Sequence, residues 1–392
     1  MFYICLLSIP FLHAFGFFNI SFPLMIFSIS IFLIVLSRNL NLRINFDKKD
    51  NLLIFFLLLG IISIDFSRVG FENLGHVYLW ILSIGVFYFG TKILIINNSI
   101  SISKIKKVFF IGLMITSIGV IFEFFTANFF GFYLSDYLPY AIGELDETRN
   151  FSGNLYRVRG FSAEPGFTAM VYELFLPLGI LYCYKKPHLY LFVFFILFGY
   201  LILTSAASLI ILALLIIIFL ARSNFKNFVR SVLAISLLGL IFYNQIAFYI
   251  FESIGPKLLL VFIGESVRIE LLTNLTSIFF NNPFGIGLGT QSFYFENYGS
   301  FQGTILPGAG ALNLYLEIAI SSGYLGIISF LFFIIIVLFK SFKYSSSPER
   351  NALIFSFLWL LGHHFFLTEY YFPMIWVTIA LLDKYQLLSK HK

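Results

Sequence analysis

Hydrophobic residues occur in long runs along this chain, and short polar stretches separate the runs. A helix needs about 20 apolar residues to cross the hydrocarbon of a bilayer, or about 17 where the bilayer thins. The runs lack the alternation of apolar and polar residues that a membrane barrel shows. The pattern therefore predicts an all-α protein with about twelve transmembrane helices, at approximately 2–18, 20–37, 51–66, 76–96, 108–126, 167–184, 188–203, 206–221, 231–251, 318–339, 351–367 and 371–388.

Composition supports a polytopic integral membrane protein. The chain has 59% hydrophobic residues, 54 Phe and only 11% charged residues, which is too apolar for a soluble core. Its Lys and Arg residues predict the orientation, because loops that stay in the cytoplasm carry the basic excess. With both termini cytoplasmic, all but six of the 25 basic residues fall inside, and the outward ones are Arg68, Arg149, Arg157, Arg159, Lys257 and Arg268. The positive net charge thus reflects topology, and we expect no nucleic-acid partner.

Two outward connections are long enough to carry function, because long loops without structure of their own tend to be functional. The predicted organisation is helices 1 to 5 in residues 1–126, a first outer loop at 127–166, helices 6 to 9 in 167–251, a second outer loop at 252–317, and helices 10 to 12 in 318–392. No internal repeat relates the two halves, which weakens a transporter interpretation.

The first long loop contains the stretch Arg157-Val-Arg-Gly-Phe-Ser-Ala-Glu-Pro165 on the side where basic residues should be rare. Guanidinium groups bind phosphate oxygens in a bidentate, fixed geometry. This stretch therefore predicts a site for an anion.

A second polar feature is the glycine run, residues 281–289, with the sequence Asn-Asn-Pro-Phe-Gly-Ile-Gly-Leu-Gly. It follows no strand and lacks the Lys-Ser/Thr ending of a phosphate-binding loop, so it does not predict a nucleotide site. We interpret it as a flexible turn where helix backbones meet.

Lone carboxylates and histidines also occur within predicted spans. Glu123 and Glu173 are expected to be interior and paired, although the sequence does not identify their partners. For His363 and His364, hydrogen bonds between packed helices are the preferred explanation over a direct functional role.

Several segments, in this order, resemble motifs of the O-antigen polymerase and ligase superfamily. Arg149 and Gly160 match the Arg-x10-Gly spacing of its polymerases. The other segments are Arg159-Gly160 with Glu164-Pro165, Leu203-Thr-Ser-Ala-Ala-Ser208, Arg268 with the glycine run, and Leu312-Asn-Leu-Tyr-Leu-Glu317 with Gly323-Tyr-Leu-Gly326.

The chain departs from that pattern at two places. Ser205-Ala206 stands where family members often have Ser-Arg, and Leu312-Asn313 stands where a His-Asn pair is common. That histidine is associated with the ligase branch, so its absence favours the polymerase branch.

The resemblance implies a GT-C-like fold in the bacterial inner membrane, with periplasmic outer loops. It also implies a glycosyltransferase that polymerises undecaprenyl-diphosphate-linked oligosaccharide repeat units into O-antigen, capsule or another surface polysaccharide. Arg159 and Arg268 would stabilise the leaving diphosphate, assisted by Arg157 and Arg149. Glu164 would act as a base or orient the acceptor, unless it only forms a salt bridge with a neighbouring arginine. The further substrate-binding candidates are Gly160, Asn313 and Glu317.

No metal-ligand cluster stands out in the outer loops, so we expect neither a metal nor another cofactor. The expected partners are the lipid-linked glycan, the bilayer and, optionally, a co-polymerase that regulates chain length. Two alternatives stay open. One is an O-antigen ligase, which transfers the glycan to lipid A core, and the other is a flippase that moves the lipid-linked glycan without chemistry.

The charge distribution generates a topology prediction. Cysteines placed at Ser152 and Ser300, in a background without Cys5 and Cys183, should react with a membrane-impermeant reagent in intact spheroplasts. Protection of either position would contradict the outward placement of both long loops.

Overall fold

A computed structural model describes most of the membrane-spanning part of the chain. The described residues are 1–12, 21–37, 46–65, 74–98, 100–134, 151–152, 155–156, 158–162, 164–183, 186–203, 205–221, 267–290, 313–343, 347–368 and 372–390.

Apart from one two-residue ladder, the regular structure of these residues is helical. The helices are α1 (Phe2–Ser8), η1 (Ile9–Phe11), α2 (Phe22–Ser37), α3 (Asp50–Ile62), α5 (Leu74–Leu82), η2 (Ser83–Phe89), α6 (Gly90–Asn97), α7 (Ile102–Phe130), α8 (Pro165–Cys183), η5 (Pro187–Leu189), α9 (Tyr190–Ile202), α10 (Ala206–Ala221), α14 (Val267–Asn281), α16 (Leu314–Lys343), α17 (Pro348–His363), α18 (Pro373–Asp383) and α19 (Tyr385–Lys390). The ladder pairs β1 (Phe151–Ser152) with β2 (Leu155–Tyr156) in antiparallel register.

Four continuous helical stretches among the described residues are long and apolar enough to cross a membrane: Gly75–Asn97, Ile102–Phe130, Pro165–Cys183 and Leu314–Lys343. The prediction of a helical membrane protein is therefore confirmed. Other apolar helices, such as α2 and α3, fall within predicted spans but are shorter than 18 residues. The predicted span at 231–251 lies outside the described residues, so the number of twelve stays a prediction.

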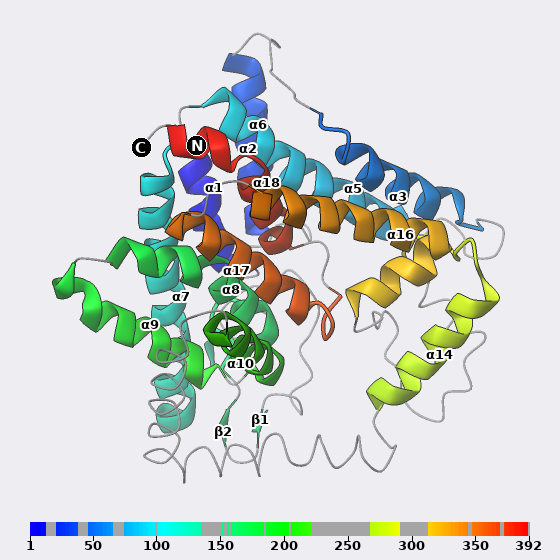
Figure 1. Ribbon diagram of the computed structural model, residues 1–392. Helices are drawn as coiled ribbons and strands as arrows, with labels where there is room; N and C mark the ends of the chain where they lie inside the picture. Colours follow the sequence, from blue (N-terminus) through cyan, green and yellow to red (C-terminus); the bar gives the residue numbers. More distant parts are fainter. Residues whose placement is uncertain are drawn as a thin grey trace.

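The helices pack in several neighbouring pairs. α7 lies against α8 and α9, α16 lies against α3, and α17 contacts both α8 and α18. Both chain ends lie at one end of the molecule, and the β1–β2 hairpin lies at the other (Figure 1). The two chain ends therefore share one end of the molecule, and the paired strands β1 and β2 of the first long loop lie at the opposite end.

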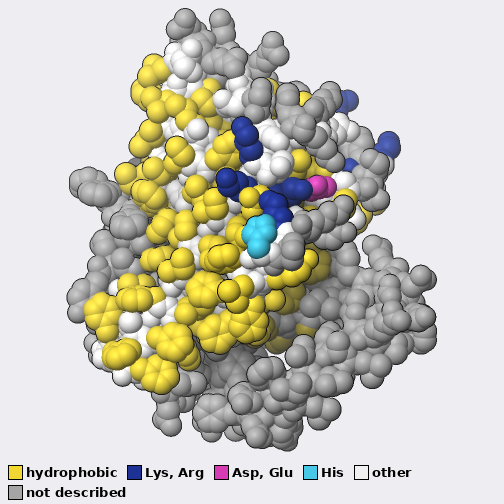
Figure 2. Space-filling model, turned by 90° about the vertical axis from the view of Figure 1, so that its left-hand side faces the viewer, with side chains coloured by type: hydrophobic (Ala, Val, Ile, Leu, Met, Phe, Trp, Pro, Cys, Tyr) yellow, Lys and Arg dark blue, Asp and Glu magenta, His cyan; other side chains and the backbone are white. Residues whose placement is uncertain are grey.

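A broad apolar surface covers the side of the molecule formed partly by α7 and α9. Figure 2 shows hydrophobic side chains across this face, with Lys and Arg side chains gathered towards its upper part. Phe129 and Leu191 are 67% and 74% exposed, respectively. Lys104 and Lys107, near the start of α7, are also exposed. An exposed apolar face of this extent fits contact with lipid, and its basic residues lie near the end expected in the cytoplasm.

The glycine run closes a break in α16. The backbone of Gly323 has φ 66°, which is not helical, so the hydrogen-bond ladder of α16 is interrupted there. Two amides of the glycine run replace the lost donors: Ile286 N–H donates to Ile320 O at 2.8 Å, and Gly287 N–H donates to Ser321 O at 2.9 Å. The break is thereby tolerated inside an apolar helix, because its backbone groups remain satisfied.

The same run also contacts α3, where Leu288 N–H donates to Gly60 O at 3.0 Å. A Cβ on Gly285, whose φ is +89°, would lie 2.5 Å from Ser321 O, so only glycine fits this approach. The interpretation of the run as a turn where helix backbones meet is confirmed. The second long loop is also more regular than its sequence suggested, because residues 267–281 form α14.

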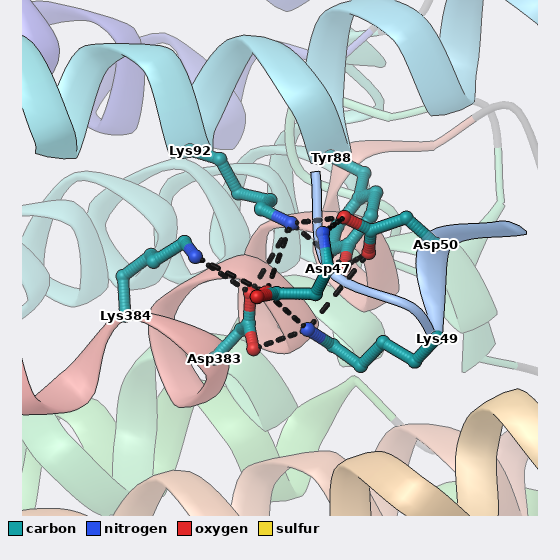
Figure 3. Close-up of polar contacts among 7 residues, drawn as sticks. All are labelled: Asp47, Lys49, Asp50, Tyr88, Lys92, Asp383 and Lys384. Carbon is teal, nitrogen blue, oxygen red and sulfur yellow. Dashed lines mark hydrogen bonds and ion pairs between the residues drawn. The ribbon is translucent and has the colours of Figure 1, made fainter. Parts of the chain in front are cut away.

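Six charged side chains form a compact charge cluster at the end of the molecule that holds the termini (Figure 3). The cluster is defined by Asp47, Lys49, Asp50, Lys92, Asp383 and Lys384, which come from the start of α3, from α6 and from the end of α18. Lys49, Asp50 and Lys92 are 2%, 0% and 2% exposed, respectively. Three positive charges therefore meet three negative charges, and of the six side chains only that of Asp47, at 26% exposure, has substantial contact with solvent.

Each lysine of the charge cluster bridges more than one carboxylate. Lys49 Nζ lies 2.5 Å from Asp383 Oδ1 and 2.8 Å from Asp47 Oδ2. Lys92 Nζ lies 2.6 Å from Asp50 Oδ2 and 3.3 Å from Asp383 Oδ2. These bridges join three segments that are far apart in sequence, so the cluster fixes the C-terminal helices against α3 and α6.

The charges in this cluster favour their own ionised forms. Burial raises the pKa of the Asp47 carboxyl, but the hydrogen bond from Lys49 and the charges of all three lysines together lower it more, so the net pKa lies below its usual range. Burial lowers the pKa of Lys49, but the three aspartates together raise it more, so the net pKa lies above its usual range. The stabilisation by Asp47 is thus lost only as pH falls through its depressed pKa, and that by Lys49 only as pH rises through its elevated pKa.

Removing one lysine should leave an uncompensated buried carboxylate. We expect Lys92→Met to destabilise the protein by about 3–5 kcal/mol, as for other broken buried ion pairs. Chemical unfolding in detergent measures the change, and Lys104→Met at the exposed start of α7 serves as control. Equal stability of the two variants would show that the cluster does not hold the helices together.

Candidate functional site

The Arg159-Gly160 pair of the first long loop is fixed on a buried carboxylate in the last third of α7. Glu123 is 0% exposed, and its Oε2 accepts hydrogen bonds from the backbone N–H groups of Arg159 at 2.7 Å and Gly160 at 2.6 Å. Successive N–H groups that converge on one oxygen form an effective anion-binding arrangement. Glu123 is therefore interior and paired, as the sequence predicted.

Gly160 is required for this geometry. Its φ is +63°, in the left-handed region that side chains disfavour, and an added Cβ would lie 3.0 Å from Val120 Cγ2 on α7. The structure thus gives Gly160 a definite role, which is to turn the chain so that two amides face Glu123.

The side chain of Arg159 is buried beside the β1–β2 hairpin. It is 3% exposed, and its Nη2 donates to the hydroxyl of Tyr156 on β2 at 2.6 Å. The N–H of Tyr156 in turn donates to Asn128 Oδ1 on α7 at 2.9 Å. The guanidinium is therefore positioned by a tyrosine that is itself tied to a membrane helix.

The carbonyl of Arg159 connects this corner to the first turn of α8. It accepts hydrogen bonds from the hydroxyls of Ser162, at 3.1 Å, and Thr168. Glu164 precedes α8, and its backbone carbonyl accepts a hydrogen bond from Phe167 N–H in the first turn at 3.2 Å. The Glu164 side chain is exposed, and it forms no ion pair within the described part of the chain. Its predicted base or orienting role stays a prediction.

A second buried carboxylate lies further along α8. Glu173 is 0% exposed, and its Oε1 lies 2.6 Å from His363 Nδ1 on α17. The hydroxyl of Ser208 on α10 donates to the same oxygen at 2.5 Å. Glu173 is therefore interior and paired, as the sequence predicted. His363 joins α17 to α8 by a hydrogen bond, which agrees with its expected role between packed helices.

The start of α16 abuts the end of α17. The Leu314 N–H donates to His364 O at 3.0 Å, and Asn313 Oδ1 accepts from Leu316 N–H at 3.0 Å, which caps the first turn. Glu317 lies in this turn and is 2% exposed. The first residue of α16, Leu314, is thus in direct contact with His364 at the end of α17.

The described contacts place the predicted site residues in two groups. Arg159 bonds to the start of α8 through its carbonyl, and Gly160 bonds to Glu123 on α7. Asn313 and Glu317 lie at the start of α16, where the neighbouring Leu314 bonds to the end of α17. Arg149 and Arg157 lie outside the described residues. Arg268 lies in the first turn of α14, and its side chain is not among those described.

Tyr156 and Asn128 contribute to this site without having been predicted as site residues, and Ser208 entered the sequence analysis only as the last residue of the segment 203–208. Their polar groups lie among many similar ones, and only the contact partners in the fold distinguish them. Among the residues that the structure describes, no group of three or more His, Cys, Asp or Glu side chains is arranged to hold a metal ion.

No family model matches this chain, and no curated protein matches it either.

The pairing of Glu123 predicts a stability effect. Glu123→Gln keeps the shape but removes the charge that two amides bind, and we expect it to destabilise the protein by roughly 1.5–3 kcal/mol. Unfolding in detergent measures the change. The control is Glu349→Gln, whose partly exposed pair with Lys106 at 2.9 Å should contribute at most about 1 kcal/mol. A Glu123→Gln protein as stable as the control would contradict the anchoring role of Glu123.

Proposed function

We propose that this protein polymerises undecaprenyl-diphosphate-linked oligosaccharide repeat units into O-antigen, capsule or another surface polysaccharide. In this proposal it is a GT-C-like enzyme with about twelve spans in the bacterial inner membrane. Both termini lie in the cytoplasm, and the reaction takes place at the periplasmic face. The ordered motifs between Arg149 and Gly326 support this assignment.

The observation that carries the proposal is the position of Arg159. Its backbone is anchored on Glu123 and its guanidinium on Tyr156, in a corner from which water is largely excluded. A guanidinium held in this way needs little reorganisation to bind a diphosphate oxygen, and electrostatic stabilisation is strongest where water is excluded. This supports a role on the leaving group of a lipid diphosphate.

In the proposed reaction, a sugar hydroxyl of the incoming repeat unit attacks the anomeric carbon of the growing chain. A new glycosidic C–O bond forms, and the bond between that carbon and the diphosphate oxygen breaks. The electron pair stays on the departing undecaprenyl diphosphate, where Arg159 and Arg268 stabilise it with help from Arg149 and Arg157. Glu164, Gly160, Asn313 and Glu317 line the substrate site in this proposal.

The alternatives differ in acceptor or in chemistry. A ligase would use the same donor but lipid A core as acceptor, and the Leu312-Asn313 departure argues against that branch. A flippase should place charges along a central path through several spans. In the described part of the chain, the carboxylates Glu123 and Glu173, which lie within candidate spans, are each bound by groups of the protein, which gives no support to a charged path through the spans.

Arginine-to-lysine variants test the proposal in a strain without the chromosomal gene. That strain should carry surface lipid capped with a single repeat unit, and the wild-type gene should restore long polymer. We expect Arg159→Lys and Arg268→Lys to lower the polymerisation rate on the order of 100-fold to 1000-fold, because lysine keeps the charge but loses the bidentate fork. Gel analysis of the polysaccharide and assays on membranes measure the loss.

Arg159→Lys keeps the backbone N–H that Glu123 binds, so the anchor of the loop backbone on α7 is preserved in this variant. Arg149→Lys should have a milder effect, and Arg222→Lys on the predicted cytoplasmic side should have none. Wild-type polymerisation by both Arg159→Lys and Arg268→Lys would contradict this mechanism. Loss of all attached sugar in the deletion strain, with long polymer still on the lipid carrier, would identify a ligase.

A further inference from the structure

The buried pair of Glu173 and His363 is unlike a simple packing contact. Both side chains are almost completely buried, at 0% and 1% exposure, and each comes from a different helix. Glu173 Oε1 lies 2.6 Å from His363 Nδ1 and accepts from Ser208 Oγ at 2.5 Å, while Ser208 Oγ lies 2.8 Å from the hydroxyl of Tyr200. Three helices besides α17 thus contribute to holding one imidazole ring in one orientation.

This arrangement decides which nitrogen of His363 is available. A carboxylate only accepts hydrogen bonds, so Nδ1 carries the proton that faces Glu173, and Nε2 is left with its lone pair. The Nε2 edge faces the start of α8, where a Cβ on Gly166 would lie 3.8 Å from it. Gly166 follows Glu164-Pro165 directly, and Thr168 in the same turn is bonded to the Arg159 carbonyl.

The chemistry of the pair suits proton transfer. A carboxylate that holds Nδ1–H fixes the tautomer and stabilises the imidazolium formed when Nε2 takes a proton. Packing alone would not call for two ionisable groups in an apolar helix interface, because burying them is expensive. Because the pair lies beside the first turn of α8, a functional role would explain why two ionisable groups are buried there.

We propose that His363 is the general base of the transfer reaction and that Glu173 is its positioning residue. This inference rests on the proposed polymerase function. As the acceptor hydroxyl attacks the anomeric carbon, its proton passes to His363 Nε2, the new glycosidic bond forms, and the departing diphosphate takes the electron pair of the broken bond. His363 then releases the proton to water before the next cycle. Glu164 orients the acceptor in this scheme and takes no proton.

The test compares substitutions that preserve different parts of the pair. His363→Asn keeps an N–H near Glu173 but has no atom at the position of Nε2, so the helices stay joined while the base is lost. We expect its polymerisation rate to fall by about 100-fold to 10,000-fold, the usual range for loss of a general base. The matched control is His364→Asn, which alters the neighbouring buried histidine on the same helix and should retain near wild-type rates.

A pH profile separates catalysis from packing. The titratable groups beside His363 are Glu173 from α8 and His364 from its own helix, while Ser208 bonds to Glu173 and Tyr200 bonds to Ser208. The wild-type rate should fall on acidification, because a general base must be unprotonated to accept the hydroxyl proton. Glu173→Gln should move this acid limb, because the carboxylate no longer supports the imidazolium, and His363→Asn should abolish it.

The measurement uses purified full-length protein and lipid-linked repeat units extracted from the deletion strain. His363→Asn activity within a few-fold of wild type would overturn the role of His363. If His363→Asn does not accumulate in membranes, an unchanged acid limb in Glu173→Gln would overturn it instead. These outcomes are distinct from failure of the proposed function, in which the wild-type protein itself would form no polymer.

Discussion

Lipid offers no hydrogen-bond partner, so each charge buried among these helices must find its partner within the chain. Three lysines and three aspartates neutralise one another near the termini, and their mutual bridges join α3, α6 and the end of α18. Towards the other end, Glu123 binds two backbone amides and Glu173 binds His363 and Ser208. Because an unpaired charge in this setting costs several kcal/mol, these pairings determine which helices are neighbours.

The same constraint shapes the candidate site. Glu123 draws the Arg159-Gly160 turn onto α7, and the Arg159 carbonyl ties that turn to α8. Glu173 then joins α8 to α17, whose end contacts the start of α16. The Arg159-Gly160 turn is thus linked to the start of α16 through α8 and α17.

Much of this could be predicted from local sequence, and some could not. Apolar runs identified helical segments, and the glycine run was correctly interpreted as a meeting of helix backbones. Lone carboxylates in apolar runs signalled buried pairs, but their partners lie 36 residues away for Glu123 and 190 residues away for Glu173. Which distant residues become partners depends on how the helices pack, and the periodicity of the sequence does not specify that packing. The break in α16 at Gly323 and the helix at 267–281 were not predicted either, because both depend on contacts between segments that are distant in the sequence.

The proposal that this protein joins lipid-linked repeat units is tested most directly with isolated components. The purified protein is incubated in detergent or vesicles with extracted undecaprenyl-diphosphate-linked repeat units, and the products are resolved by size. We expect a ladder whose steps equal one repeat unit, with one undecaprenyl diphosphate released for each bond formed. Unchanged single units, or transfer of the glycan only when lipid A core is added, would contradict the proposal.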